Sequence, residues 1–154
     1  MPRPGSPPPY AFRVKTRNEL RDLIGDFGGK MPKEVKAELR PLLRRTGQGA
    51  LMAVRSNASW STRIPRATRL QISLAGKRPG VAVVTNKNRA PGARPLEHQG
   101  RPGRIRHPLF GDRKRWVTQP AQPFMTEEAP KWQAEVRDGI REIVDQVARR
   151  NGFR

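Results

Sequence analysis

The chain has 154 residues, of which 34% are hydrophobic, and this fits one domain with a modest core. It contains no cysteine, which excludes a disulfide framework and thiolate chemistry, and no apolar run approaches the ~20 residues needed to span a bilayer. The formal net charge is +19, and residues 40–116 hold 18 of the 32 basic residues but only two of the 13 acidic ones. Because such a density of like charge opposes compaction, this segment needs a polyanion or acidic protein surfaces nearby.

Residues 1–15 are predicted to form an extended arm. The first nine positions are rich in proline, which favours a polyproline-like backbone, and they lack the apolar core of a signal peptide. Two interpretations stay open: a disordered tail, and an arm that reaches a neighbouring subunit.

Two helices are expected next. Apolar residues recur at helical spacing in residues 16–27, and two glycines follow them. Pro32 suits the first turn of a second helix, whose apolar face runs from Val35 to Val54 and which should end within residues 57–61. Proline removes a backbone donor and clashes with the preceding turn, so we expect a kink or a break at Pro41.

Strand-like sequence follows. Residues 70–74 alternate apolar and polar side chains, residues 76–80 suit a turn, and residues 81–84 are apolar, which together predict an antiparallel hairpin. The stretch 85–123 is rich in Arg, Pro and Gly and is too long for a plain loop. It is either a projecting hairpin, with Val117 on its return strand, or an ordered interaction loop.

Residues 127–150 carry the clearest helix pattern. Thr126 suits an N-cap, Glu127 and Glu128 suit the first turn, and Gly152 suits the end. Before this helix, Phe124 is an apolar anchor in a proline-restricted segment. We expect the following residues to pack in a core: Phe124, Trp132, Val136, Ile140, Ile143 and Val147.

These elements predict an α+β fold: a small antiparallel β-sheet packed against helices, a long C-terminal amphipathic helix, an extended N-terminal arm and a long basic loop or hairpin. Residues 16–154 are expected to form a single domain, with a basic excursion at about residues 85–118.

No pattern in the sequence favours an enzyme, a cofactor or a metal. His98 and His107 are the two histidines; their spacing matches no ligand set, and the surrounding positive charge opposes metal binding. A Gly-x-Ser-x-Gly elbow and a phosphate-cradling glycine loop are both absent from the sequence. We therefore assign no catalytic, cofactor-binding or metal-binding residue.

The basic excursion is instead predicted to be an interaction surface for acidic protein surfaces or for DNA phosphate. Arginine forks suit carboxylates and phosphates equally. Trp60 and Trp116 are of interest as base-stacking residues, although core or interface anchoring is the favoured role for each. The predicted interaction residues are Arg89, Arg94, Arg101, Arg104, Arg106, Arg113, Lys114 and Arg115.

The order of short motifs resembles the neck and tail-completion proteins of long-tailed bacteriophages. Pro65, Leu70 and Ser73 match a first motif, and Pro123 with Phe124 match the Pro-Phe pair before a closing helix. Between them, a second motif is matched by Ala93, Glu97 and Gly100. The resemblance covers roughly residues 30–150.

The resemblance implies a structural virion protein without enzymatic activity. It implies an α+β subunit that forms a ring, commonly a hexamer, and acts in head–tail joining as a neck, tail-completion or tail-terminator protein. The implied partners are other copies of the chain, adjacent neck, head-connector and tail-tube proteins, and genomic DNA in the lumen, without a membrane. The implied location is the head–tail junction of the virion, after synthesis in the host cytoplasm. The alternative hypothesis is a basic nucleic-acid-binding protein of ribosomal or nucleoid type.

Overall fold

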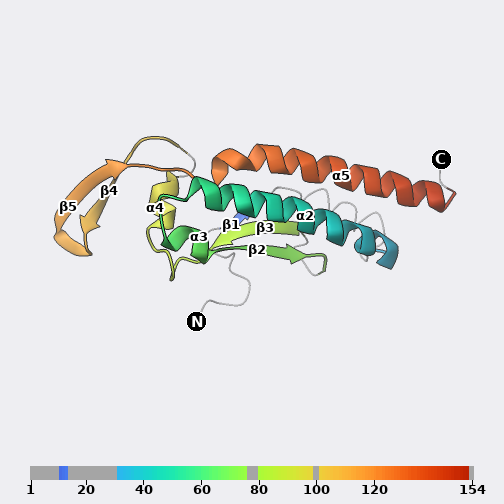
Figure 1. Ribbon diagram of the computed structural model, residues 1–154, viewed down its shortest axis with the longest axis horizontal. Helices are drawn as coiled ribbons and strands as arrows, with labels where there is room; N and C mark the ends of the chain where they lie inside the picture. The colour runs from blue at the N-terminus through green and yellow to red at the C-terminus, as the bar shows by residue number, and fades with distance from the viewer. Residues whose placement is uncertain (1–10, 14–30, 76–79, 99–100, 153–154) are drawn as a thin grey trace.

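The computed structural model describes residues 11–13, 31–75, 80–98 and 101–152, and in this part the chain has an α+β fold. Strands β1 (Ala11–Arg13), β2 (Thr68–Ser73) and β3 (Gly80–Thr85) form an antiparallel sheet in the order β1-β3-β2. Helix α2 (Lys33–Asn57) lies on this sheet, and helix α5 (Ala129–Arg150) lies along the other side of α2 (Figure 1). The body therefore has three layers, and α2 is the middle one.

We expected a kink or a break at Pro41; helix α2 continues through this residue, so the break does not occur. Pro41 is exposed, whereas Leu39 and Leu43 on either side of it are fully buried. Packing before and after the proline holds the helix together and offsets the loss of one backbone hydrogen bond. The predicted end of this helix is confirmed, since Ala58 is its C-cap.

Two glycines let α2 approach its neighbours closely. A Cβ at Gly47 would lie 2.7 Å from Leu70 Cδ1 on β2, and a Cβ at Gly49 would lie 2.7 Å from the ring of Trp132 on α5. Contacts this short occur only where the side chain is a hydrogen atom. Arg150 also joins the far end of α5 to Glu38 on α2, at 2.6 Å.

The predicted hairpin of β2 and β3 is confirmed. The strands pair from Thr68–Thr85 to Ser73–Gly80. The hydroxyl groups of Thr68 and Thr85 are 2.8 Å apart in the buried end of the sheet; the Thr68 hydroxyl donates to the Ile64 carbonyl at 2.7 Å and accepts from the Thr85 hydroxyl. Val81 and Val83 share one side of β3 and are buried beneath α2, and β3 itself lies between the two other strands.

Two short helices lie near one end of the body. Helix α3 (Arg63–Ala67) leads directly into β2, and helix α4 (Ala93–Glu97) follows β3. Strands β4 (Arg104–Leu109) and β5 (Asp112–Pro120) then form a separate antiparallel hairpin that projects from this end (Figure 1). The excursion is therefore a projecting hairpin, and Val117 lies on its return strand as predicted.

The start of the C-terminal helix differs from the prediction. Thr126 makes no side-chain cap; residues Thr126–Glu128 form a 3₁₀ turn (η2), and α5 begins at Ala129 with Glu128 as its N-cap. The Thr126 hydroxyl instead donates to the carboxylate of Glu97, far away in the sequence, which also accepts the N–H groups of Phe124, Met125 and Thr126. The end is as predicted, with the last helical residue at Arg150 and Gly152 at φ +79°.

Several predicted features lie outside the described residues: the helix at 16–27, most of the N-terminal arm, and most of the turn at 76–80. None of the helices in the described part of the chain combines the length and apolar composition needed to cross a bilayer.

Candidate functional site: a projecting basic hairpin

The β4–β5 hairpin is closed by a tight turn with an unusual residue at its tip. Leu109 pairs with Asp112, and the two residues between them, Phe110 and Gly111, have φ values of +51° and +82°. Positive φ at both central positions is the requirement of a type I′ turn, where Asn-Gly is the usual pair. Phenylalanine is a rare choice in this conformation, and Phe110 is 99% exposed.

A bulge beside the turn concentrates positive charge at the tip. Pro108 pairs with Trp116, but the next pair joins Leu109 to Asp112, so residues 113–115 have no partner on β4. Asp112 Oδ1 accepts the N–H of Lys114 at 2.9 Å, and Trp116 Nε1 donates to the Arg113 carbonyl at 2.8 Å. These bonds shape a loop that presents three consecutive cations, the tip cluster: Arg113, Lys114 and Arg115.

One face of the hairpin is basic and aromatic. The Arg106 guanidinium lies 5.3 Å from the centroid of the Trp116 ring, which is a cation–π distance. Trp116 is 48% exposed, so the ring and the arginine form an open surface. The opposite face is more apolar: Ile105 is buried, and His107 and Val117 are half-buried.

The structure places the eight predicted interaction residues in two groups, and all eight are exposed. Arg89 follows β3 and Arg94 is on α4, both on the body. The other six lie on the hairpin or immediately before it: Arg101, Arg104, Arg106, Arg113, Lys114 and Arg115.

Glu97 fixes the base of the hairpin to the helical body, a role that sequence reasoning missed. Its Oε2 accepts the N–H groups of Phe124 at 2.8 Å and Met125 at 3.1 Å, and its Oε1 accepts the N–H of Thr126 at 2.8 Å and the Thr126 hydroxyl. The N–H of Gln122 also donates to the Leu96 carbonyl at 2.9 Å. The chain thus enters and leaves the hairpin at one anchored point. The available signal was that Glu97 is one of only two carboxylates inside a strongly basic segment.

The predicted packing residues lie in the core. Phe124 is 2% exposed, and its ring meets Trp60 edge-on with centroids 6.4 Å apart, so Trp60 is an anchor of the body rather than a free stacking platform. On α5, Val136, Ile140 and Val147 are buried, and Trp132 and Ile143 are half-buried against them.

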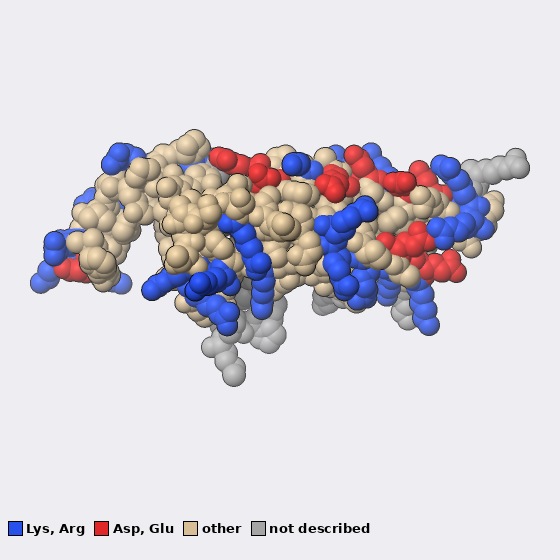
Figure 2. All heavy atoms as spheres, in the orientation of Figure 1, with Lys and Arg blue, Asp and Glu red and all other residues tan. Residues whose placement is uncertain are grey.

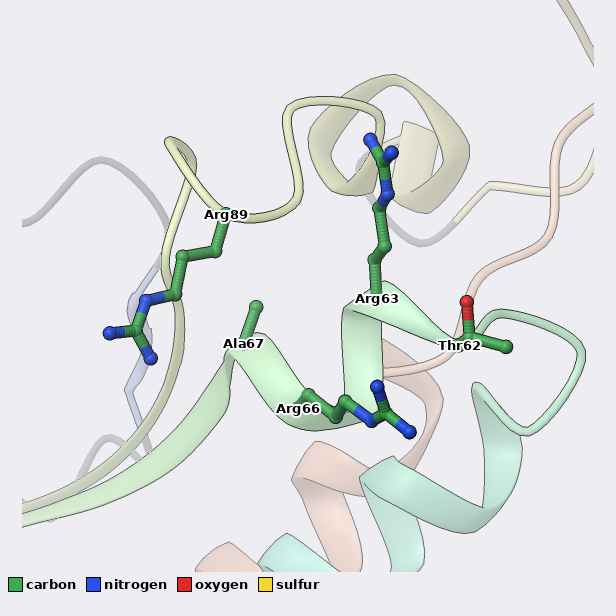
Figure 3. A pocket seen from close by; sticks show the side chains of 5 residues that line it. All are labelled: Thr62, Arg63, Arg66, Ala67 and Arg89. Atoms are coloured by element: carbon green, nitrogen blue, oxygen red, sulfur yellow. The ribbon is translucent and has the colours of Figure 1, made fainter.

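A second basic surface was not singled out from the sequence. Near α3 an open hollow of about 350 Å³ is lined by Thr62, Arg63, Arg66, Ala67 and Arg89 (Figure 3). The three guanidinium groups point away from one another around Ala67, so they do not form a ready-made fork for one anion. The hollow extends the basic surface without defining a chemical site.

The solvent side of α5 carries a stripe of acidic residues, with the exposed basic residues Lys131, Arg137, Arg141, Arg149 and Arg150 around it. Its exposed residues Glu135, Asp138, Glu142 and Asp145 recur at steps of three and four, which aligns them on one helical stripe, the acidic face. Figure 2 shows acidic side chains gathered along the α5 edge and basic ones projecting from the hairpin and the opposite edge. One subunit therefore presents a basic hairpin and, on α5, an acidic stripe that is flanked by basic residues.

The two histidines lie apart from any carboxylate set that suits a metal. His98 is the C-cap of α4 and His107 is on β4, where its Nδ1 lies 3.1 Å from the Pro108 carbonyl. Across the described residues, no group of three or more His, Asp or Glu side chains is placed to hold a metal ion. Comparisons with protein-family models, with curated proteins and with solved structures find no match for this chain.

Proposed function

We propose that this chain is a structural protein of a bacteriophage virion that assembles as a ring at the head-to-tail connection and joins the head connector to the tail tube. The proposal combines the motif order of the sequence with one structural observation. That observation is a basic hairpin that leaves the body and presents exposed aromatic and cationic side chains.

The hairpin needs another surface to be well ordered. An isolated two-stranded hairpin is at best marginally stable in water, because it has no layer to cover its apolar face. Within the described residues, β4 and β5 pair only with each other, and the backbone hydrogen bonds that join this hairpin to the body lie at its base. Ile105 on the apolar face is buried, but His107 and Val117 are only half-buried, and an assembly would cover the rest of this face, as expected of a subunit whose folding and association are linked.

The charge distribution supports a closed ring of identical subunits. A heterologous contact joins one surface of a subunit to a different surface of the next, and such contacts close into rings when the rotation allows it. The basic hairpin and the acidic face of α5 are two such surfaces on one chain. A hexamer is the ring size that the family resemblance implies.

Native mass spectrometry and negative-stain imaging of purified, nuclease-treated protein test the ring directly. We expect a ring of one stoichiometry, or a monomer that assembles when head-connector or tail-tube proteins of the same phage are added. In virions, a label on this subunit should lie at the head–tail junction. A label found on the capsid, or a protein absent from particles, would contradict the proposal.

The second candidate function is nucleic-acid binding of ribosomal or nucleoid type. It is favoured by the basic surface that α3 and the arginine hollow add to the hairpin. Tight binding of free duplex or RNA by the purified protein, with an affinity that falls steeply as salt rises, would support it. Weak binding with a shallow salt dependence would favour the structural role.

A further inference from the structure

The residue at the hairpin tip has no explanation within the folded subunit. Asn or Gly would satisfy the left-handed turn at position 110 with less strain than the bulky ring of Phe110. The ring is 99% exposed, so it contributes no packing to its own chain. A large apolar side chain held outward beside three cations is typical of an anchor that inserts at an interface.

The subunit also carries, on α5, a stripe of carboxylates whose charge complements the basic tip, with Lys131 and Arg149 at its two ends. The acidic face of α5 points away from the core, because the buried residues Val136, Ile140 and Val147 occupy the opposite side of the helix. Asp138, Glu142 and Asp145 of this face are exposed.

The hairpin of one chain is held away from the acidic face of the same chain. Its base is tied to the body by the Glu97 carboxylate and by the bond from Gln122 to Leu96. From this base the strands extend beyond the end of the body, whereas α5 runs in the opposite direction (Figure 1). Contact between the two surfaces therefore requires two copies.

We propose that the hairpin tip of one copy docks on the acidic face of α5 in the neighbouring copy, with Phe110 as the apolar anchor and the tip cluster paired with the α5 carboxylates. This inference deepens the proposed function, since it identifies the contact that builds the ring. Individual exposed ion pairs contribute little, so the contact depends on several charges and one buried ring together.

A charge exchange tests the contact. The tip variant carries Arg113→Glu, Lys114→Glu and Arg115→Glu, and the helix variant carries Asp138→Lys, Glu142→Lys and Asp145→Lys. Glu135 is left unchanged because it accepts a hydrogen bond from the buried hydroxyl of Thr46 at 3.4 Å. Sedimentation velocity and native mass spectrometry report assembly, and circular dichroism verifies the fold of every variant.

We expect each variant alone to be monomeric, because its tip and its helix face then carry charge of the same sign. An equimolar mixture of the two should recover wild-type-sized oligomers in which the variants alternate, since each tip meets a face of opposite charge. A single chain with all six changes should also assemble. The matched control is Arg40→Glu, Arg44→Glu and Arg45→Glu, an equal change in charge on exposed positions of α2, and it should assemble like wild type.

A separate variant isolates the aromatic anchor. Phe110→Asn keeps a residue that tolerates positive φ and removes the ring, so the subunit should stay folded. Its association should weaken on the order of tenfold or more, the effect of losing one interface anchor. Unchanged association would remove Phe110 from the interface and overturn its role.

The docking is overturned if the tip variant assembles like wild type, if mixing restores nothing although both variants are folded, or if wild-type protein stays monomeric at the highest concentration. Loss of assembly in the α2 control alone would assign the contact to a different basic face and also overturn it. These outcomes are separate from the virion role. A ring that persists in the tip variant leaves the proposed function standing, whereas charge-exchange rescue in a protein absent from the head–tail junction upholds the docking alone.

Discussion

Replacing Glu97 should destabilise the protein more than any other change to a single surface-accessible carboxylate. The half-buried carboxylate accepts three backbone N–H groups, from Phe124, Met125 and Thr126, and the Thr126 hydroxyl. In Glu97→Ala the amides of the buried residues Phe124 and Met125 lose their acceptor. An unsatisfied buried donor costs about 1–3 kcal/mol, so we expect a loss of about 3 kcal/mol of unfolding free energy.

Glu97→Gln should lose less unfolding free energy than Glu97→Ala. The carbonyl oxygen of the glutamine can still accept hydrogen bonds, whereas its NH₂ group would face N–H donors and make none. Retaining half of the bonds predicts a loss of about 1.5 kcal/mol. For a chain of this length, each kcal/mol lowers the melting temperature by about 2–4 °C, which gives roughly 6–12 °C for the alanine variant.

Thermal unfolding followed by circular dichroism measures these shifts, and hydrogen exchange at the amides of residues 124–126 reports the local effect. The matched control is Glu127→Ala, an exposed carboxylate on the same turn, which should shift the melting temperature by less than about 1 °C. An alanine variant of Glu97 that melts like the wild type, with unchanged exchange at those amides, would refute the reasoning.

Three further outcomes are expected. Ile140→Ala should cost about 2–5 kcal/mol because it leaves a cavity between α5 and α2, and thermal unfolding checks it; unchanged stability and unchanged assembly would count against core packing. Phe124→Ala should cost about 3–5 kcal/mol and change the fluorescence of Trp60, the ring that meets Phe124 edge-on; a native melting temperature would contradict this. The triple substitution Arg101→Ser, Arg104→Ser and Arg106→Ser, at exposed positions on the hairpin or just before it, should leave the melting temperature nearly unchanged. It should nevertheless block head–tail joining, which would be visible as separate heads and tails. Normal yields of joined particles would exclude that role.

The sequence by itself determined the elements whose signals are local. The apolar stripe of α5, the alternation of β2 and the short apolar run of β3 are visible as periodicity, and each became the predicted element within a few residues. Charge density marked residues 89–115 as an exposed surface, and the structure places six of the eight predicted cations on or beside one hairpin. The sequence-local expectations of a helix break at Pro41 and a helix N-cap at Thr126 were not met, because contacts with residues distant in the sequence determined the backbone there.

Only the tertiary structure decided how these elements meet. Leu39 and Leu43 are buried on both sides of Pro41, and this packing carries α2 through a residue that would end an isolated helix. Glu97 and Phe124 are 27 residues apart, so no local pattern indicates that one carboxylate serves the start of another element. Likewise, no local pattern indicates that Gly49 lies against Trp132, or that the hairpin is held away from the acidic face of α5. Periodicity specifies which side of an element is apolar, but the identity of its neighbour depends on non-local packing, which only the folded chain defines.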